Sequence, residues 1–411
     1  MPPRPLKRPA HIPPLSSLLS AGQPLSTGGS PVPLSASPFL VRPAHVALVL
    51  DDTYAQNDRS GQRGWGPNIV IGKQPGGKVT QLSGVVLRSS KNSMEDTFAS
   101  GFKTVTVKVL DKHPPTFPTE GQQKHFALPL IPTDEPIRDN LPAWLDALSV
   151  ASKNEYTVEI TLEAYGNQAP PSNGQDQLVA AQYEQIEELL SKAYSHDFDI
   201  FNLKKGEVKS DEDAHADEIK GARFILDAFG GPPTHWTSSQ LLRSTQLQDW
   251  SGFCSRLALH PRVYVKLSPP VASLRKSGGL KALDKEARSE FRRIVRIWID
   301  AVLDALGDER LIFAATGLDP GNLCTSDKPT SKGDMPAVVA VGDADESLVE
   351  RTQAIALEQE TKEAQEKRED EALTEVELWF EIVREVLADI GVDSLAMSKI
   401  FEGNAQKLYG L

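Results

Sequence analysis

The chain closes with Ile400-Phe401-Glu402-Gly403-Asn404-Ala405-Gln406-Lys407-Leu408-Tyr409-Gly410-Leu411, and this stretch decides the fold we expect. It has the pattern of a helix that ends in Gly-Asn-Ala-x-x-Leu-Tyr-Gly-Leu. Just before it, residues 375–390 carry apolar side chains at spacings of three and four, which is typical of a helix with one apolar face. The end of the chain is therefore expected to be helical.

Short runs of apolar or alternating residues precede this closure and predict strands. Helical patterns lie between several of them, at residues 140–151, 178–194 and 286–306. Such alternation indicates βα units and a parallel sheet. An eighth strand is expected near the weakly patterned start of the chain. The seven predicted strands are His45–Leu50, Leu82–Leu87, Phe102–Leu110, Tyr156–Leu162, Arg223–Leu226, Arg262–Leu267 and Arg310–Ala315.

The closing helix and the order of the strands resemble the amidohydrolase-related family, in its lactonase-like branch. That resemblance implies a single (β/α)8 TIM barrel over residues 41–411, with hydrolysis of an amide or lactone at the C-terminal ends of the strands. The segments that carry it are His45–Asp58 as second strand, Leu82–Val109 as third and fourth strands, Arg223–Pro233 as sixth, His260–Ser268 as seventh, and Gly307–Phe313 as entry to the eighth.

Length and charge limit the other possibilities. The 411 residues exceed the roughly 250 that one barrel needs, so insertions or a second domain must take up the rest. The net charge of -12 argues against nucleic acid as the main partner, because phosphate binding requires clustered Lys and Arg. It also argues against an anionic membrane surface. No apolar run reaches the roughly 18 residues of a transmembrane helix.

Two segments are predicted to lie outside the barrel. Residues 1–40 are rich in Pro, Ser and Leu, and we expect a disordered leader. Residues 324–372 are predicted to be a flexible acidic insertion after strand eight, and a protein partner binding through 340–372 is left open. The two cysteines predict free thiols and hence the cytoplasm. The acid-poor, basic start also fits a mitochondrial transit peptide, although its prolines oppose an amphipathic helix.

The resemblance also implies a metal site that this sequence does not reproduce. Family members activate water with one or two divalent metal ions, held by a His-x-His pair after the first strand, further histidines, and an Asp after the eighth; some lactonases use a His/Asp set alone. None of the eight histidines here forms a His-x-His pair. The sixth-strand His position holds Ala228, and the eighth-strand Asp position holds Thr316. A divergent N-terminus explains only the first loss, so the usual bound metal is not expected, and a divalent metal held by other ligands remains the alternative.

Five residues at strand ends are the candidate site residues. Asp227, His235 and Asp319 are the candidate acid–base groups, and Lys266 and Thr316 the candidate substrate contacts. Three of them have a structural alternative. Asp227 equally fits a carboxylate bonded to turn amides, and Lys266 fits a partner for a neighbouring acid. His235 fits an exposed loop residue.

Glu159 and Glu163 alternate onto one face of the fifth strand, and we interpret them as polar filler of the barrel or as surface residues. Phosphate-loop, dinucleotide and Gly-x-Ser-x-Gly motifs are absent from the sequence. The sequence therefore predicts a hydrolase that acts on a small carboxylated lactone or amide without the usual bound metal. The alternative is a catalytically inactive barrel that binds a ligand or a protein. The sequence does not indicate an oligomeric state.

Overall fold

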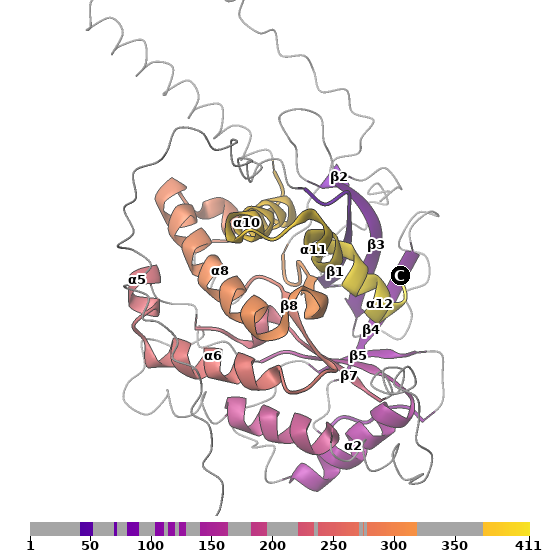
Figure 1. Cartoon of the computed structure of the whole chain (residues 1–411). Helices are drawn as coiled ribbons and strands as arrows, with labels where there is room; N and C mark the ends of the chain where they lie inside the picture. Colours follow the sequence, from indigo (N-terminus) through magenta and orange to yellow (C-terminus); the bar gives the residue numbers. More distant parts are fainter. Residues whose placement is uncertain are drawn as a thin grey trace, which may run out of the picture.

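The computed structural model places eight parallel strands in a nearly closed barrel (Figure 1). It describes residues 42–51, 70–71, 80–89, 103–110, 114–119, 123–128, 140–162, 182–194, 221–233, 237–270, 274, 278–318 and 373–411. The predicted leader and the predicted insertion at 324–372 fall outside these residues and stay predictions.

The barrel strands follow one another in chain order. They are β1 (His45–Asp51), β3 (Thr80–Ser89), β4 (Lys103–Val109), β5 (His125–Leu128), β6 (Thr157–Ile160), β7 (Arg223–Leu226), β8 (Val263–Leu267) and β9 (Leu311–Phe313). Each pairs in parallel with the next. The short β2 (Val70–Ile71) pairs antiparallel with β3. The last strand approaches the first, because the Ala315 amide donates to the Val49 carbonyl at 3.0 Å.

The (β/α)8 barrel is confirmed, but the predicted numbering of the strands in its first half was wrong by one. The eighth strand is β5, in the middle of the chain, and was not recognised. His45–Leu50 is consequently the first strand rather than the second, and β3 and β4 are the second and third. From Tyr156 onward the predicted strand numbers agree with the structure. β5 has four residues, His125–Leu128.

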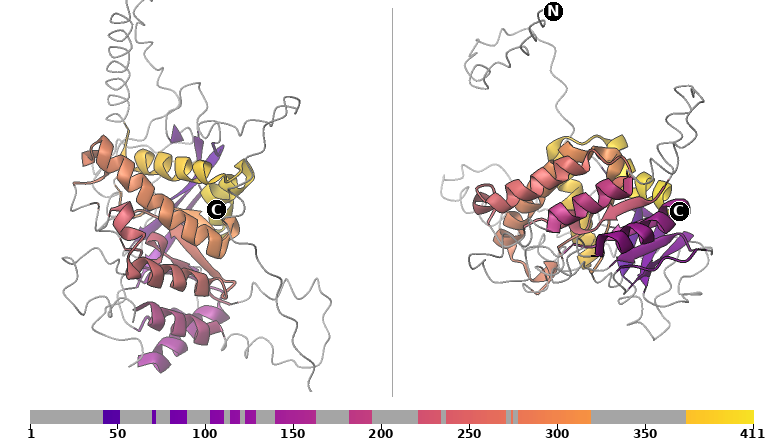
Figure 2. Two further views of the ribbon diagram at one scale, coloured as in Figure 1. Left: turned by 60° about the vertical axis from the view of Figure 1, so that its left-hand side comes forward. Right: turned by 90° about the horizontal axis from the view of Figure 1, so that it is seen from below.

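Helices cover the outside of the barrel. The described ones are α2 (Leu141–Lys153), the helix at 182–194, α5 (Ser238–Leu241), α6 (Thr245–Leu257), α8 (Lys285–Leu306), α10 (Glu375–Ile390), α11 (Ser394–Ser398) and α12 (Asn404–Tyr409). α8 packs between α6 and α10, and the two views of Figure 2 show these helices side by side. None of the helices in the described residues is long and apolar enough to span a membrane.

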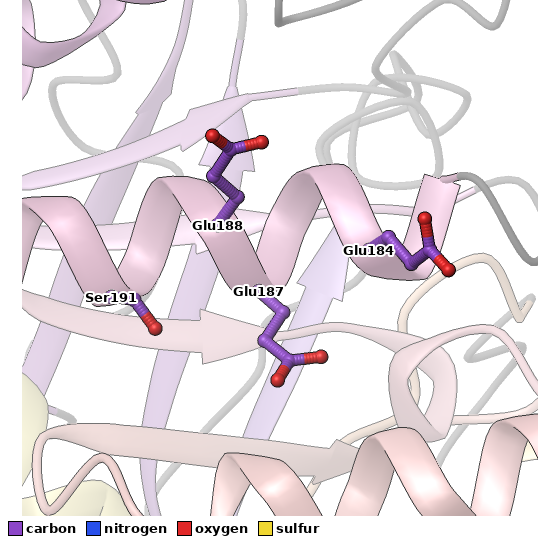
Figure 3. A pocket seen from close by; sticks show the side chains of 4 residues that line it. All are labelled: Glu184, Glu187, Glu188 and Ser191. Atoms are coloured by element: carbon purple, nitrogen blue, oxygen red, sulfur yellow. The ribbon is translucent and has the colours of Figure 1, made fainter.

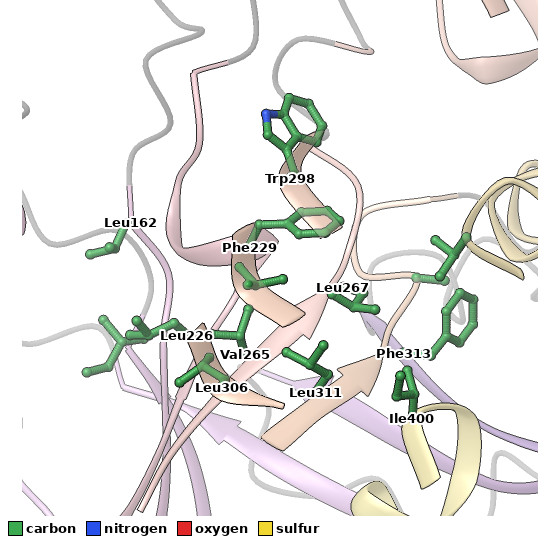
Figure 4. Close-up of a cluster of buried hydrophobic side chains, with 14 of the residues drawn as sticks. Leu162, Leu226, Phe229, Val265, Leu267, Trp298, Leu306, Leu311, Phe313 and Ile400 are labelled. Carbon is green, nitrogen blue, oxygen red and sulfur yellow. The ribbon is translucent and has the colours of Figure 1, made fainter. Parts of the chain in front are cut away.

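Alternation along each strand divides the core into two parts. The outer part lies between strands and helices, and Figure 4 shows Leu226, Val265 and Leu311 there with Trp298. Trp250 and Trp379 are also fully buried. The inner part fills the barrel and contains Ala47, Val49, Val86, Val107, Ala127, Ile225, Ile312, Ala314, Ala405, Leu408 and Tyr409.

The last helix closes the N-terminal opening of the barrel. The Asn404 side chain donates to the carbonyls of Asp308 and Leu311, at the entry to β9, at 2.7 Å each. Thr157, the first residue of β6, donates to the Leu408 carbonyl at 3.4 Å. α12 is therefore held against the strand starts, opposite the rim where active sites of this fold are built.

Candidate active site

Polar side chains point into the barrel near the C-terminal ends of four strands. Arg88 lies at the end of β3, Glu159 and Thr161 at the end of β6, Asp227 directly after β7, and Lys266 at the end of β8. Each is separated by an even number of residues from an inward-facing position of its strand, so its side chain also points into the barrel. Because all eight strands are parallel, their ends share one rim, and the side chains meet there.

Asp227 accepts hydrogen bonds on both carboxylate oxygens. Its Oδ1 accepts from the Ser268 hydroxyl at 2.5 Å, the Thr316 hydroxyl at 3.1 Å and the Ala228 amide at 3.1 Å. Its Oδ2 accepts from Arg88 Nη1 at 2.6 Å. The three donors on Oδ1 fix the carboxylate, while Oδ2 faces a single cation among the described residues.

The Arg88 guanidinium joins two carboxylates at this rim. Besides its pair with Asp227, its Nη2 donates to the Thr161 hydroxyl at 3.0 Å, and its Nε lies 3.4 Å from Glu159 Oε2. The Arg88 side chain is 10% exposed, whereas the Glu159 side chain is wholly buried. Arg88 therefore lies between the buried interior and the mouth of the barrel.

Deeper in the barrel, Glu159 binds two further groups. Its Oε2 lies 2.7 Å from Lys266 Nζ, with both side chains fully buried. Its Oε1 accepts a hydrogen bond from the Tyr409 hydroxyl at 2.5 Å. Lys266 Nζ also lies 5.8 Å from the centre of the Tyr409 ring. The interior thus holds two cations, Arg88 and Lys266, against two carboxylates, Glu159 and Asp227.

These contacts perturb the acidity of two groups. Burial alone would raise the pKa of Asp227, but Arg88, Lys266 and the hydroxyls of Ser268 and Thr316 outweigh it and lower that pKa to about 2. Burial, strengthened by the neighbouring Glu159 carboxylate, raises the pKa of the Tyr409 phenol well above its ordinary value. Asp227 is therefore a carboxylate, and Tyr409 a neutral donor, at any physiological pH.

The backbone after Asp227 is strained. Ala228 and Phe229 have φ of 46° and 57°, values that residues with a side chain rarely adopt, and Gly230 and Gly231 continue the left-handed path. Surrounding groups hold the turn: Trp250 Nε1 donates to the Phe229 carbonyl at 3.2 Å, and the Tyr183 hydroxyl donates to the Gly231 carbonyl. Strain of this kind clusters at functional sites.

Three of the five predicted site residues meet at this rim: Asp227, Lys266 and Thr316. The contacts of Asp227 include the turn amide of Ala228, and Lys266 pairs with an acid, so both structural alternatives are also present. Their roles in catalysis and substrate binding stay predictions. His235 and Asp319 lie outside the described residues.

Sequence reasoning missed Arg88 and Tyr409. For Arg88 a signal existed, because it ends the apolar run Val85-Val86-Leu87 two positions after Val86, which faces inward. Tyr409 belongs to the closing stretch that identified the scaffold, and nothing local indicated that its hydroxyl reaches a carboxylate from β6. Glu159 lies inside the barrel, in agreement with its interpretation as polar filler, and Glu163 lies outside the described residues.

The described groups at the rim do not fit a divalent metal ion. Among the described residues, no three His, Cys, Asp or Glu side chains gather where they could hold one. Asp227 and Glu159 are engaged by Arg88 and Lys266, whose positive charges oppose a further cation. Since β1 is the first strand, the His-x-His pair that the resemblance implies would follow it, and the sequence there reads Asp52-Thr53-Tyr54.

A pocket on the outside of the barrel is acidic. It lies on the helix at 182–194 and is lined by Glu184, Glu187, Glu188 and Ser191 (Figure 3). Glu187 pairs with Arg256 of α6, and Glu188 pairs with Lys192. These carboxylates form a solvated helix face with its own cations, and the pocket adds nothing to the candidate site.

Neither protein-family models nor curated proteins match this sequence. Solved structures with a similar fold include a zinc-bound amidohydrolase from Burkholderia multivorans, with TM-score 0.45, 12% identity, and coverage of 90% of this chain and 100% of that one. The fold itself is a (β/α)8 TIM barrel. Amidohydrolase 2 from Bifidobacterium longum subsp. infantis has TM-score 0.38 and 10% identity, covering 90% of this chain and 99% of that one. A probable 2-pyrone-4,6-dicarboxylic acid hydrolase from Acinetobacter baumannii, with citric acid bound, has TM-score 0.37 and 10% identity, covering 80% and 84%. At such identities the likeness concerns the fold alone.

Proposed function

We propose that this protein hydrolyses a small carboxylated lactone or amide at the C-terminal mouth of its barrel, without a metal held by the family's usual ligands. The observation that carries the proposal is the Arg88–Asp227 pair. It joins a cation and a carboxylate at 2.6 Å on the rim where enzymes of this fold carry their active sites, beside a strained turn.

In this proposal Arg88 binds the carboxylate of the substrate. A guanidinium offers paired N–H donors that match the two oxygens of a carboxylate. Arg88 is the more exposed of the two buried cations, with Lys266 fully buried behind it. Lys266 then contributes its charge through Glu159 and Asp227, and Thr316 keeps Asp227 in place.

Binding of the substrate carboxylate to Arg88 frees Oδ2 of Asp227. The loss of its cation raises the pKa of Asp227, which makes the carboxylate a better base. Water then attacks the carbonyl carbon and passes a proton to Oδ2. The C–O or C–N bond breaks as that proton moves to the leaving oxygen or nitrogen, and Asp227 returns to its ionised form. His235 and Asp319 remain the predicted additional acid–base groups.

The experiment compares small lactones and amides, 2-pyrone-4,6-dicarboxylate among them, as free carboxylates and as methyl esters. We expect hydrolysis of a free carboxylate and loss of activity with its ester. Arg88→Met should raise KM at least tenfold, and Asp227→Asn should abolish kcat. Arg256→Met is the matched control, because Arg256 pairs with Glu187 on the outer surface, far from the rim.

Metal analysis of the purified protein tests the second part of the proposal. We expect no stoichiometric metal by mass spectrometry. Zinc or manganese at one ion per chain would contradict a site without metal. Equal hydrolysis of acid and ester would instead contradict the role of Arg88.

A second candidate function is supported by the pKa of Asp227, which Arg88, Lys266 and two hydroxyls lower to about 2 against the effect of burial. A carboxylate of that acidity is a weak proton acceptor. In this alternative the barrel binds a small carboxylate without converting it. Tight binding of carboxylates by wild type, abolished in Arg88→Met, with no turnover of any panel member, would favour the binding protein over the hydrolase.

A further inference from the structure

The C-terminal helix reaches the candidate site from the opposite end of the barrel. Tyr409, the last residue of α12, enters through the N-terminal opening, and its hydroxyl donates to Glu159 Oε1 at 2.5 Å. The two residues lie 250 positions apart in the sequence. The closing stretch of the chain therefore contacts the polar interior as well as sealing the barrel.

Glu159 also contacts both buried cations. While Oε1 accepts from Tyr409, Oε2 lies 2.7 Å from Lys266 Nζ and 3.4 Å from Arg88 Nε. The contacts at Oε2 are ion pairs without hydrogen-bond geometry, so the hydrogen bond from Tyr409 is the directional contact of the Glu159 carboxylate. The Tyr409 hydroxyl thus selects the rotamer of Glu159, and Glu159 in turn faces the Nε edge of the guanidinium that pairs with Asp227.

Because Glu159 is completely buried, its orientation depends strongly on its partners in the protein. The Glu159 and Lys266 side chains have no exposed surface, and Tyr409 is 2% exposed, so the protein must supply the partners of Glu159. A buried acceptor that loses its donor is left unsatisfied at a considerable free-energy cost. Without the phenol, Oε1 loses its donor, and we expect the carboxylate to turn toward Lys266 and Arg88 and to shift the guanidinium.

We propose that Tyr409 is a positioning residue of the barrel-mouth site: acting through Glu159, it orients the Arg88 guanidinium that receives an anionic ligand. The ligand part of this inference rests on the proposed function. The positioning part rests on the contacts alone.

The placement of α12 allows the hydroxyl to be tested by itself. Asn404 ties the helix to β9, Leu411 packs against Gly84, and Ala405 and Leu408 fill the barrel floor. None of these contacts uses the phenol oxygen. Tyr409→Phe is therefore expected to keep the helix docked and to remove only the hydrogen bond to Glu159.

Tyr264 provides the matched control. It also points into the barrel, from β8, and packs against the same inner cluster. Its charged neighbours are Arg223, Arg310 and Glu309 at the strand starts, not Glu159. Tyr264→Phe makes the same chemical change inside the same barrel without touching the network.

The direct readout is the Arg88 Nε–H resonance in protein labelled with ¹⁵N-arginine, assigned by its absence in Arg88→Lys. We expect its hydrogen exchange to accelerate about tenfold in Tyr409→Phe and to stay within twofold of wild type in Tyr264→Phe. The second readout is the affinity for malonate by calorimetry, expected to fall about tenfold in Tyr409→Phe only. Circular dichroism confirms that each variant is folded.

The outcomes separate the two ideas. If the Arg88 resonance of Tyr409→Phe matches wild type, or if both tyrosine variants change it equally, the positioning role is refuted. If wild-type protein binds no malonate while the resonance still responds to Tyr409→Phe, the positioning role stands and the anionic-ligand part of the proposed function fails.

Discussion

Removal of the buried lysine is the sharpest test of the inner network. Lys266 Nζ lies 2.7 Å from Glu159 Oε2, and neither side chain has exposed surface. Lys266→Met keeps the apolar volume and leaves Glu159 as a buried carboxylate with Tyr409 and Arg88 as its remaining partners. Breaking a buried ion pair by removing one partner costs about 3–5 kcal/mol. Because two partners of Glu159 remain, we expect the lower end, about 3 kcal/mol of unfolding free energy.

Urea unfolding followed by tryptophan fluorescence measures this loss. The double variant Lys266→Met with Glu159→Gln removes both charges, and the Tyr409 hydroxyl can still donate to the glutamine oxygen. It should lose less stability than Lys266→Met alone, since no unpaired charge is buried. Arg256→Met is the control, because its pair with Glu187 is 44% and 26% exposed and such pairs contribute about 0–1 kcal/mol. A single-variant loss below about 1 kcal/mol, or a double-variant loss equal to the sum of the two single losses, refutes the reasoning.

Three further predictions concern pH and packing. Burial opposes ionisation of Asp227, but Arg88 and its other partners lower its pKa from 3.8 to about 2. The ionised carboxylate therefore stabilises the fold above about pH 4. As the pH falls from 4 to 2, roughly 2 kcal/mol of unfolding free energy is lost. Asp227→Asn should lack this dependence in urea titrations at stepped pH; an unchanged dependence contradicts it. Burial lowers the pKa of His125 from 6.5 to about 4, so the folded state excludes the charged ring, and stability should decline as the pH falls from 6.5 to 4. His125→Gln should flatten that decline, and a slope equal to wild type rules the explanation out. The indole of Trp379 donates to the carbonyls of Leu267 and Ala314 at 3.1 and 3.0 Å. Trp379→Phe should therefore lower the free energy of unfolding in urea by about 1–3 kcal/mol. A loss below about 0.5 kcal/mol would mean that these hydrogen bonds make no net contribution to stability.

The strands that could be predicted from sequence share one property. Arg223–Leu226 and Val263–Leu267 alternate buried outer and inner positions and run directly into a turn, so burial on both faces appears as a short apolar run. β5 (His125–Leu128) is as short as β7 and also has two outward positions, Phe126 and Leu128, but Pro129 follows it directly in the sequence. Proline is typical of a loop or of a strand edge, so the sequence did not mark this segment as a barrel strand.

The candidate site was predictable where its residues end strands. Asp227, Lys266 and Thr316 follow apolar runs, and parallel strands bring such positions to one rim. Arg88 and Tyr409 became recognisable only through contacts 139 and 250 residues distant, to Asp227 and Glu159. Such pairings depend on barrel registration and on the depth to which the last helix enters, and neither is encoded by local spacing.

The charge inside the barrel argues for exchange of an anion and against capture of a metal. Arg88 and Lys266 supply two positive charges, and Glu159 and Asp227 supply two negative ones, so the charges of this four-residue network balance. A divalent cation would add charge that no free carboxylate among these residues offsets. A carboxylate ligand can instead replace Asp227 at the guanidinium of Arg88, so that the cation keeps one partner and the freed Asp227 gains basicity. The same neutrality explains why the Tyr409 hydroxyl matters: it adds a donor to Glu159 without adding charge, and so fixes the network without disturbing its balance.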